Sequence, residues 1–266
     1  MLLRWYCRVV ASEITDERSI QTRIADDLRA RIEIGEYAAG DQLPTYEQLT
    51  QRYLCSSGVA RKAIDLLRQQ GLVVSKQGKG VFVRERARPK RHGIDRYARS
   101  RWKQGGTAIH DAEAGNQGLS VKQLYRELGE VPAPPAVAAA FGIEEGAPVW
   151  VRKRTTIVDG RPHQLADSYY PLDLAVGTRL TEENSGPGGG FARLDEAGDP
   201  LAEIREEWSA RMPSSPESVS LQLPGGTPVI DLTRIVYDTK GRAVEVMLAV
   251  IAADTVEISY RFPIPD

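Results

Sequence analysis

A repeated motif in the second half of the chain restricts the fold more than any other sequence feature. The sequence GAPV at 146–149 is matched by GTPV at 226–229, and an arginine follows five residues after each valine, Arg154 and Arg234. A Gly-Arg pair comes next in both copies. Each copy is typical of a long strand, a turn and a returning strand. Two such hairpins predict a pseudo-symmetric antiparallel sheet backed by helices, an α+β fold, and argue against an all-helical domain.

The residues around the repeat extend this prediction. Pro134 and Pro135 are expected to begin a helix, and a second helix is expected at about 200–208. The glycine-rich segment 184–190 is expected to be a loop without regular structure. Four segments rich in β-branched residues are expected to be strands. These expected strands are 149–158, 163–171, 228–238 and 243–254.

Charge is divided unevenly along the chain. Residues 1–110 hold 21 Lys and Arg against 12 Asp and Glu, whereas residues 111–266 hold 14 against 24, although the net charge of the whole chain is −1. A basic half joined to an acidic half indicates a nucleic-acid-binding module followed by a different domain. The alternative is chance clustering of charge on solvated surfaces.

Composition narrows the class of protein further. With 41% apolar and 27% charged residues, the chain is expected to be globular and soluble. No apolar run approaches the roughly 18 residues of a membrane span, and the start at 1–11 lacks a signal-peptide cleavage site. The two cysteines, Cys7 and Cys55, are too few for a disulfide scaffold, and no Cys/His cluster has zinc spacing. We therefore expect a cytoplasmic protein with no metal, cofactor or membrane partner.

The basic half is expected to contain three helices and a hairpin. Helical spacing of apolar residues begins after Ser19. Thr45 and Gln48 have the spacing of a capping box at the start of a short second helix, and Ser56 is the expected N-cap of a third helix, which Gly71 ends. Two short strands around the turn QGKG complete the pattern of a winged helix-turn-helix. A small helical bundle with solvated charges is the alternative.

A winged helix-turn-helix reads DNA with its third helix and with its hairpin, the wing. Small residues at the start of the third helix allow close approach to DNA, and Arg61 and Lys62 can reach phosphate or guanine. Gln77 and Lys79 at the wing tip suit the minor groove or the phosphate backbone. The pattern therefore predicts double-stranded DNA as a partner.

Residues 24–83 resemble the DNA-binding domain of the GntR family of bacterial transcription regulators. The resemblance is carried by IEIGEYAAGDQLP, ARKAIDLL and GLVVSKQGKGVFV. It implies DNA contacts from the start of the third helix, an arginine within it and the wing-tip glycine. Together with the residues above, the candidate DNA-contacting set is Thr45, Ser56, Ser57, Gly58, Val59, Arg61, Lys62, Gln77, Gly78 and Lys79.

Two departures from the family pattern affect this set. Glu47 stands where the family often has an arginine, and Gly58 and Val59 replace the usual polar pair. Phosphate contacts are therefore expected to depend more on Arg61 and on the lysines, and the family's base preference does not carry over.

A basic segment, 85–106, separates the two halves and is expected to be a linker, either near flanking phosphates or simply solvated. Tyr97 and Trp102 within it are expected to pack on the second domain. The expected division is an N-terminal extension at 1–15, the winged helix-turn-helix at 16–84, the linker at 85–106 and the second domain at 107–266.

The second half resembles the UTRA ligand-sensing domain of the HutC branch of the GntR family, which shares the chorismate-lyase fold. The resemblance covers about 107–263 and rests on the hairpin repeat. It implies that Arg152 and Arg154 bind an oxyanion and that Glu245 binds the rest of the ligand. Two arginines one residue apart on a strand point the same way, and guanidinium groups suit oxyanions. Two surface ion-pairing arginines are the alternative.

Departures here bear on the ligand. Family hydroxyls near the central loop are replaced by Gly189 and Phe191, and Ala166 stands where the family has a glutamate, with Asp167 beside it. A sugar phosphate is therefore less expected, although the glycine-rich loop can present backbone amides to an anion or be a flexible excursion. Tyr170 can stack on a ligand or belong to the core. The candidate effector-binding residues are Arg152, Arg154, Asp167, Tyr170, Gly189, Phe191 and Glu245.

The leading functional prediction is a homodimeric transcription regulator, a repressor, that binds an inverted repeat through two copies of its N-terminal domain and responds to a small-molecule effector, for which an anion is one candidate. One alternative is a constitutive DNA-binding regulator whose second domain is vestigial as a sensor. Another is a chorismate-lyase-like enzyme, but the three histidines, His92, His110 and His163, are not placed in any catalytic motif, and a fold alone does not imply chemistry.

Overall fold

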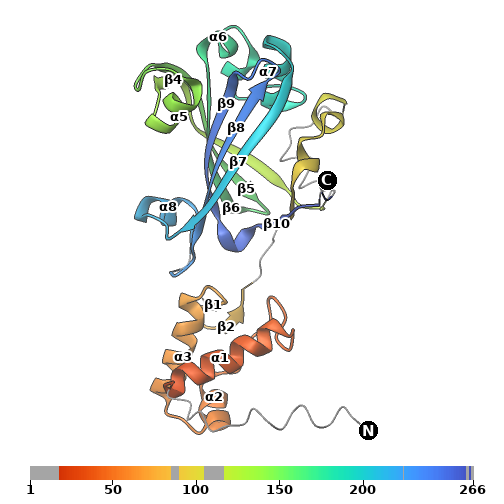
Figure 1. Cartoon of the computed structure of the whole chain (residues 1–266). Helices are drawn as coiled ribbons and strands as arrows, with labels where there is room; N and C mark the ends of the chain where they lie inside the picture. Colours follow the sequence, from red (N-terminus) through yellow and green to blue (C-terminus); the bar gives the residue numbers. More distant parts are fainter. Residues whose placement is uncertain (1–17, 85–89, 105–116, 224, 262–263, 265–266) are drawn as a thin grey trace. The chain divides into compact units, whose positions relative to one another are not determined.

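The computed structural model describes residues 18–84, 90–104, 117–223, 225–261 and 264 (Figure 1). The chain divides into two compact units, Met1–Glu85 and Arg86–Asp266. The N-terminal extension expected at 1–15 lies outside the described residues. Within the described ranges, no helix is long and apolar enough to cross a membrane.

The N-terminal unit has the three helices and the hairpin that the sequence predicts. Leu28, Leu49 and Leu67, one from each helix, are fully buried and meet Val81 of the hairpin in one apolar core. Burial of these side chains holds the short elements together, because none of the helices is long enough to be stable alone. The elements are α1 Ile20–Glu33, α2 Tyr46–Tyr53, α3 Ser57–Gln69, β1 Val73–Lys76 and β2 Gly80–Val83.

Side-chain caps fix where the second and third helices begin. Thr45 Oγ1 accepts a hydrogen bond from the Gln48 backbone N–H at 3.2 Å, and Gln48 Oε1 accepts from the Thr45 N–H at 2.8 Å, which is the predicted capping box. Ser56 Oγ accepts from the Val59 N–H at 3.4 Å. Between the two helices Leu54 has a left-handed backbone with φ 49°, so the chain turns sharply from α2 into α3.

A six-stranded antiparallel sheet forms the C-terminal unit, in the order β4-β5-β6-β9-β8-β7. The hairpins β5–β6 and β8–β9 are the two copies of the repeat, and β6 pairs with β9 at the centre. Each hairpin follows an edge strand and a short helix. The predicted pseudo-symmetric α+β architecture is confirmed. The elements are β4 Val121–Pro132, α5 Pro135–Phe141, β5 Pro148–Val158, β6 Arg161–Tyr170, β7 Leu201–Arg211, α8 Ser215–Ser220, β8 Val229–Asp238 and β9 Ala243–Ala252.

Short helices between β6 and β7 gather at one end of this sheet (Figure 1). Leu174, Leu180 and Leu194, one from each helix, are buried in a cluster with Tyr170 at the end of β6. This cluster fixes the loop that follows the second of these helices against the sheet. The helices are α6 Leu172–Ala175, η3 Arg179–Thr181 and α7 Gly189–Ala197.

Three elements differ from the sequence prediction. The helix expected at 200–208 is instead strand β7, whose residues Ile204 and Trp208 alternate with exposed charged residues while the strand pairs with β8; tertiary pairing outweighs the helix propensity of Glu, Ala and Arg. Strand β4 was not predicted, because its sequence is largely polar. The expected loop at 184–190 contains the first turn of α7, which begins at Gly189.

The described part of the expected linker is folded onto the C-terminal unit. Strand β3, Lys90–His92, pairs in parallel with β10, Glu257–Ser259, and the turns η1, Ile94–Tyr97, and η2, Ser100–Gln104, follow. Trp102 is 2% exposed, and both predicted aromatic contacts with the second domain are present. The sequence predicts a linker across 85–106, whereas the described residues 90–104 belong to the folded C-terminal unit.

Candidate nucleic-acid interface and ligand cavity

One face of α3 buries apolar side chains and leaves the predicted DNA-contacting residues on the outside. Ala60, Ala63, Ile64 and Leu67 are buried. Most of the other predicted residues on this helix are exposed to solvent, but Val59 is half-buried and packs against the core. The exposed residues are Ser56, Ser57, Gly58, Arg61 and Lys62.

The cations at the start of α3 are available to a partner. The Arg61 guanidinium lies 5.5 Å from the centre of the Tyr46 ring, a cation–aromatic contact that orients it without using its hydrogen-bond donors. In the described part of the chain neither Arg61 nor Lys62 forms an ion pair. Arg68, at the other end of the helix, is instead paired with Asp65 at 2.5 Å and donates to Ser75 Oγ. Positive charge is therefore concentrated near the helix start, as DNA recognition requires.

The wing tip, 77–79, is also exposed. Gly78 has φ 71°, a left-handed conformation that favours glycine. Gln42 Nε2 donates to the Lys79 carbonyl at 2.9 Å and so ties the wing to the segment before α2. Gln77 and Lys79 lie on the turn, as expected, whereas the predicted Thr45 hydroxyl is occupied by the α2 cap.

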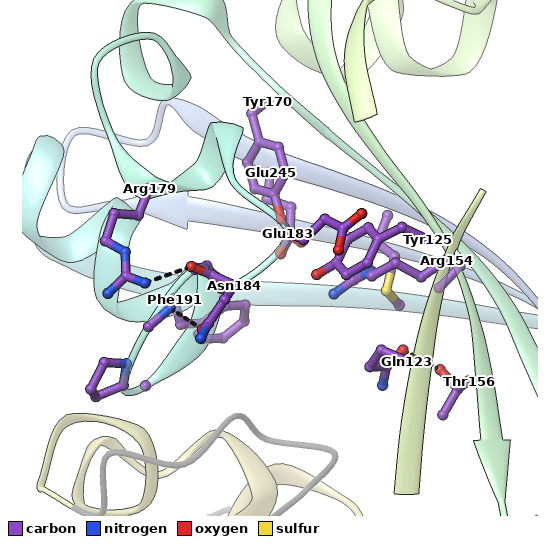
Figure 2. Close-up of a pocket in the computed structure, with 18 of the residues that line it drawn as sticks. Gln123, Tyr125, Arg154, Thr156, Tyr170, Arg179, Glu183, Asn184, Phe191 and Glu245 are labelled. Carbon is purple, nitrogen blue, oxygen red and sulfur yellow. Dashed lines mark hydrogen bonds between the residues drawn. The ribbon is translucent and has the colours of Figure 1, made fainter. Parts of the chain in front are cut away.

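A cavity of about 720 Å³ lies in the C-terminal unit between the two hairpin copies (Figure 2). Both copies contribute, with Arg154 from β5 and Arg234 from β8 at equivalent positions of the repeat. The loop 183–188 and the first turn of α7 form another wall. Of the predicted effector-binding residues, the structure brings five to this cavity. They are Arg154, Tyr170, Gly189, Phe191 and Glu245.

The two arginines of the cavity have different partners. Arg234 is 6% exposed and its Nη2 lies 2.9 Å from Glu245 Oε2. Burial works against the charge of Arg234, but the adjacent Glu245 carboxylate outweighs this and raises its pKa. Arg154 donates from Nη2 to Ser168 Oγ at 2.8 Å and its Nε has no partner. In the described ranges no carboxylate pairs with Arg154, so its charge is available to a ligand.

Further polar groups line the cavity. Tyr170 donates its hydroxyl to Glu245 Oε1 at 3.1 Å, and burial raises the pKa of Tyr170, so the hydroxyl stays protonated. Thr156 donates to Gln123 Oε1 at 3.0 Å. Gln164 is 1% exposed, and its Oε1 has no hydrogen-bond partner. A ligand can supply the donor that this buried acceptor lacks.

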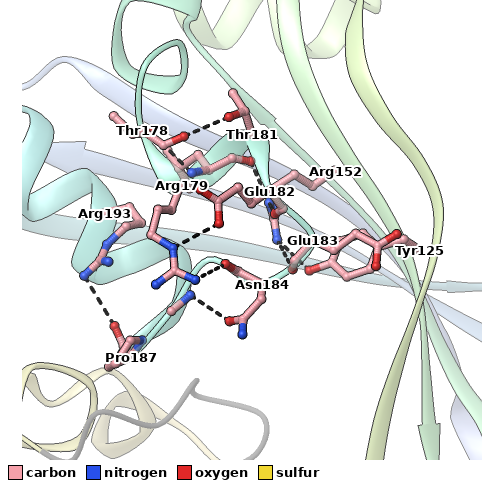
Figure 3. Close-up of polar contacts among 12 residues, drawn as sticks. Tyr125, Arg152, Thr178, Arg179, Thr181, Glu182, Glu183, Asn184, Pro187 and Arg193 are labelled. Atoms are coloured by element: carbon pink, nitrogen blue, oxygen red, sulfur yellow. Dashed lines mark hydrogen bonds and ion pairs between the residues drawn. The ribbon is translucent and has the colours of Figure 1, made fainter.

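Arg152 does not line the cavity, contrary to the prediction. Its guanidinium is buried beneath the loop and donates to the carbonyl groups of Leu180, Glu182 and Glu183, and to the Tyr125 hydroxyl at 2.5 Å (Figure 3). These bonds use its donors internally. Arg152 therefore holds the cavity wall in place, and of the two predicted arginines only Arg154 lines the cavity.

Asp167 is also placed elsewhere. Successive side chains of β6 point to opposite faces of the sheet, and Ala166 lines the cavity. Asp167 therefore points to the other face, where it forms an ion pair with Arg126. The Asp167 carboxylate therefore does not replace, in the cavity, the family glutamate at whose position Ala166 stands.

The predicted set omits several polar residues of the cavity, among them Gln123, Thr156, Gln164 and Arg234. The sequence did indicate Arg234, because the repeat places it at the position equivalent to Arg154. Gln164 and Thr156 share the strand face of residues already singled out. Gln123 lies on β4, a strand that the sequence did not reveal. Among the described residues, no group of three His, Cys, Asp or Glu is arranged to hold a metal ion.

Comparison with known proteins assigns both units. The model of the gntR family of bacterial regulatory proteins matches residues 20–83, and the UTRA domain model matches residues 116–257. An uncharacterised helix-turn-helix transcriptional regulator of Streptomyces coelicolor is 34% identical over 248 residues, which cover 91% of this chain and 92% of that protein.

Solved structures agree with this assignment. The crystal structure of a protein ascribed to the GntR family of transcriptional regulators is 26% identical, with a TM-score of 0.62, and covers 94% of this chain and 99% of that one. PhnF from Mycobacterium smegmatis, 20% identical with a TM-score of 0.56, covers 90% of this chain and 99% of that one and shares the fold. The chain therefore belongs to the GntR family of DNA-binding transcriptional regulators and carries a UTRA effector-binding domain.

Proposed function

We propose that the chain is a cytoplasmic, homodimeric repressor whose affinity for an inverted-repeat operator falls when a small anionic molecule binds in the cavity. One observation carries the proposal. Arg154 lines the cavity with an unpartnered Nε and, in the described part of the chain, without a carboxylate. A guanidinium group held in this way binds a carboxylate or a phosphate group strongly.

The first turn of α7 supports an anionic ligand. Gly189 and Gly190 line the cavity, and α7 has no side-chain cap at its start. The N–H groups of a helix start carry partial positive charge and bind anions. Since Gln164 Oε1 needs a donor, the expected ligand is an organic acid or phosphate ester that also carries a hydroxyl or amino group.

The dimer follows from the size of the DNA-binding unit. One winged helix contacts only a few base pairs, so a specific site needs two copies on two half-sites. We expect the C-terminal units to form the dimer, and the operator to be an inverted repeat. Light scattering at micromolar concentration tests this: a monomer that binds one half-site tightly contradicts it.

A ligand screen tests the sensor. The full chain is screened by thermal shift against small carboxylates and phosphate esters, and the dissociation constant of each hit is then measured for the wild type and for Arg154→Ala. Loss of a charge-assisted hydrogen bond of about 1.5 kcal/mol or more should weaken binding at least about ten-fold. Arg126→Ala, which removes an arginine from the other side of the sheet, is the matched control and should bind as the wild type does.

Two outcomes contradict the sensor proposal. Equal binding by Arg154→Ala and the wild type would remove Arg154 from the site. A screen in which no anion stabilises the chain would favour the constitutive regulator, in which the departures at Gly189 and Phe191 have abolished sensing.

A further inference from the structure

Phe191 lines the cavity and also packs against the segment 90–104, which follows the DNA-binding unit in the chain. The Tyr97 ring stacks on Phe191 with centroids 5.9 Å apart and planes at 17°, and Trp102 meets Phe191 edge-on at 6.0 Å. Trp102 Nε1 also donates to the Tyr97 carbonyl at 3.1 Å. The Phe191 side chain therefore lies between the cavity and the aromatic residues of the folded segment 90–104.

Arg234 contacts both sides of this wall. Its Nη2 is paired with Glu245 in the cavity, while its guanidinium lies 5.1 Å from the Phe191 ring centre and 5.8 Å from that of Tyr97. An anion that attracts Arg234, or a donor that competes for Glu245, changes the position of a charge that both rings contact. Such cation–aromatic contacts are strongest when they are shielded from water, as here.

The hydroxyl of Tyr97 extends the contact to β3. It donates to the Glu206 carboxylate on β7 and accepts from Arg91 Nη2 at 2.8 Å. Arg91, in β3, is 5% exposed and is itself paired with Glu206. Burial raises the pKa of Tyr97 to about 12, so the hydroxyl remains a donor at neutral pH.

The same carboxylate holds the C-terminal strand next to β3. Tyr260, which follows β10, donates to Glu206 Oε2 at 3.2 Å. Gly93, at the end of β3, fits closely under Tyr260, because a Cβ at this position would lie 2.7 Å from the Tyr260 ring. Glu206 is therefore the point at which β3, η1 and the residue after β10 are held together.

We propose that Tyr97 couples the cavity to β3, as a positioning residue that acts through Phe191 and Arg234 on one side and through Glu206 and Arg91 on the other. A ligand that rearranges the Arg234–Glu245 pair shifts the Tyr97 ring, and this weakens the hold of Glu206 on β3. Because β3 is the first described element after the DNA-binding unit in the chain, this links the cavity to the described part of the C-terminal unit that is nearest to the DNA-binding unit in sequence. This inference rests on the proposed effector site, but its test needs no effector.

The test is hydrogen exchange of the full chain, measured by mass spectrometry for the amides of 91–97 without any ligand. Glu245→Gln changes the charge on the cavity side of the wall and touches neither β3 nor η1. We expect exchange of these amides to rise at least about five-fold, the lower end of usual coupling energies. Arg234→Lys, which keeps the charge but loses the planar contact with both rings, is expected to do the same and serves if Glu245→Gln does not fold.

Two further variants make the test specific. Tyr97→Leu removes the link, so adding Glu245→Gln to it should raise the exchange of 91–97 no further. Glu217→Gln weakens the exposed pair with Arg211 and is the matched control; it should leave these amides unchanged.

The proposal is overturned if folded Glu245→Gln and Arg234→Lys proteins both exchange 91–97 at the wild-type rate. It is also overturned if the Glu217→Gln control raises exchange equally, or if the effect of Glu245→Gln persists in full without Tyr97. None of these results depends on Arg154, so they leave the ligand test of the proposed function independent.

Discussion

The two units of the chain place their functional residues in opposite positions relative to their cores. In the described part of the N-terminal unit every buried side chain is apolar, and the charged candidates Arg61 and Lys62 are exposed. In the C-terminal unit the buried set includes Arg152, Arg234 and Glu245. A DNA interface can be added to the surface of a finished apolar core, whereas a ligand cavity must bury charge and therefore depends on partners within the fold.

The largest effect expected from this contrast is on stability. Glu245→Ala leaves the buried Arg234 charge unpaired, and breaking a buried ion pair in this way costs about 3–5 kcal/mol. The free energy of unfolding of the C-terminal unit is measured by urea denaturation with tryptophan fluorescence, since Trp102, Trp150 and Trp208 all belong to that unit. Arg205 pairs with Glu207, and both side chains are more than half exposed, so Glu207→Ala should cost at most about 1 kcal/mol. If Glu245→Ala and the control variant lost equal free energy of unfolding, burial of the Arg234–Glu245 pair would be unimportant for stability.

Acid should destabilise the C-terminal unit through a histidine that has no counterpart in the described part of the N-terminal unit. Burial lowers the pKa of His163 from its usual 6.5 to about 4, and the neutral ring lies 2.8 Å from Thr255 Oγ1. The unfolded chain therefore binds a proton at higher pH than the folded chain does, so stability is full above pH 6.5 and is lost as the pH falls towards 4, by roughly 3 kcal/mol. The segment 18–84 contains no histidine.

The measurement is urea unfolding of the wild type and of His163→Gln between pH 7.5 and 4.5. The variant should lose this part of the pH dependence, although carboxylates still contribute at the acid end. A wild-type slope that survives unchanged in His163→Gln would contradict the assignment.

On the N-terminal side, substitutions should affect DNA binding rather than folding. Arg61→Ala is expected to weaken operator binding by about 1–3 kcal/mol, with relaxed preference at one base pair if the contact is to a base, or with a smaller salt dependence if it is to phosphate. Stability should change by less than about 0.5 kcal/mol. Arg68→Ala, whose arginine is already paired with Asp65, is the control in the gel-shift assay and should bind nearly normally. Unchanged operator binding by Arg61→Ala would contradict both a base contact and a phosphate contact by Arg61.

The smallest expected effect concerns the α2 cap. Thr45→Ala removes the acceptor for the Gln48 N–H and should cost about 1 kcal/mol. Hydrogen exchange of the amides 46–53 should accelerate accordingly while that of the C-terminal sheet stays constant. If operator binding falls far more than this stability loss explains, the Thr45 hydroxyl also contacts DNA.

The same contrast explains what the sequence could predict. In the N-terminal unit, apolar periodicity and the caps at Thr45 and Ser56 are local sequence signals. Helices α2 and α3 begin directly after these two caps. In the sheet, the four central strands were evident from their β-branched residues, but the edge strands β4 and β7 were not. An edge strand is half solvated and carries charge, so its sequence resembles that of a loop or helix.

The cavity was predicted only in part for a related reason. The repeat and the family resemblance indicated Arg154 and Glu245, which do line it. Whether Arg152 binds a ligand or a loop depends on carbonyl groups of 180–183, which no local pattern reveals. The error at Asp167 was one of strand register, since a shift of one residue reverses the face.

The most direct test of the account is a titration of one complex with one ligand. The wild-type chain is bound to a fluorescent operator fragment selected from the DNA upstream of its own gene, and an anion found in the thermal-shift screen is added while anisotropy is recorded. We expect the ligand to release the wild-type chain from the operator. We also expect Arg154→Ala to bind the operator with wild-type affinity but to need at least about ten-fold more ligand for release. Release of Arg154→Ala at the wild-type ligand concentration would contradict the account.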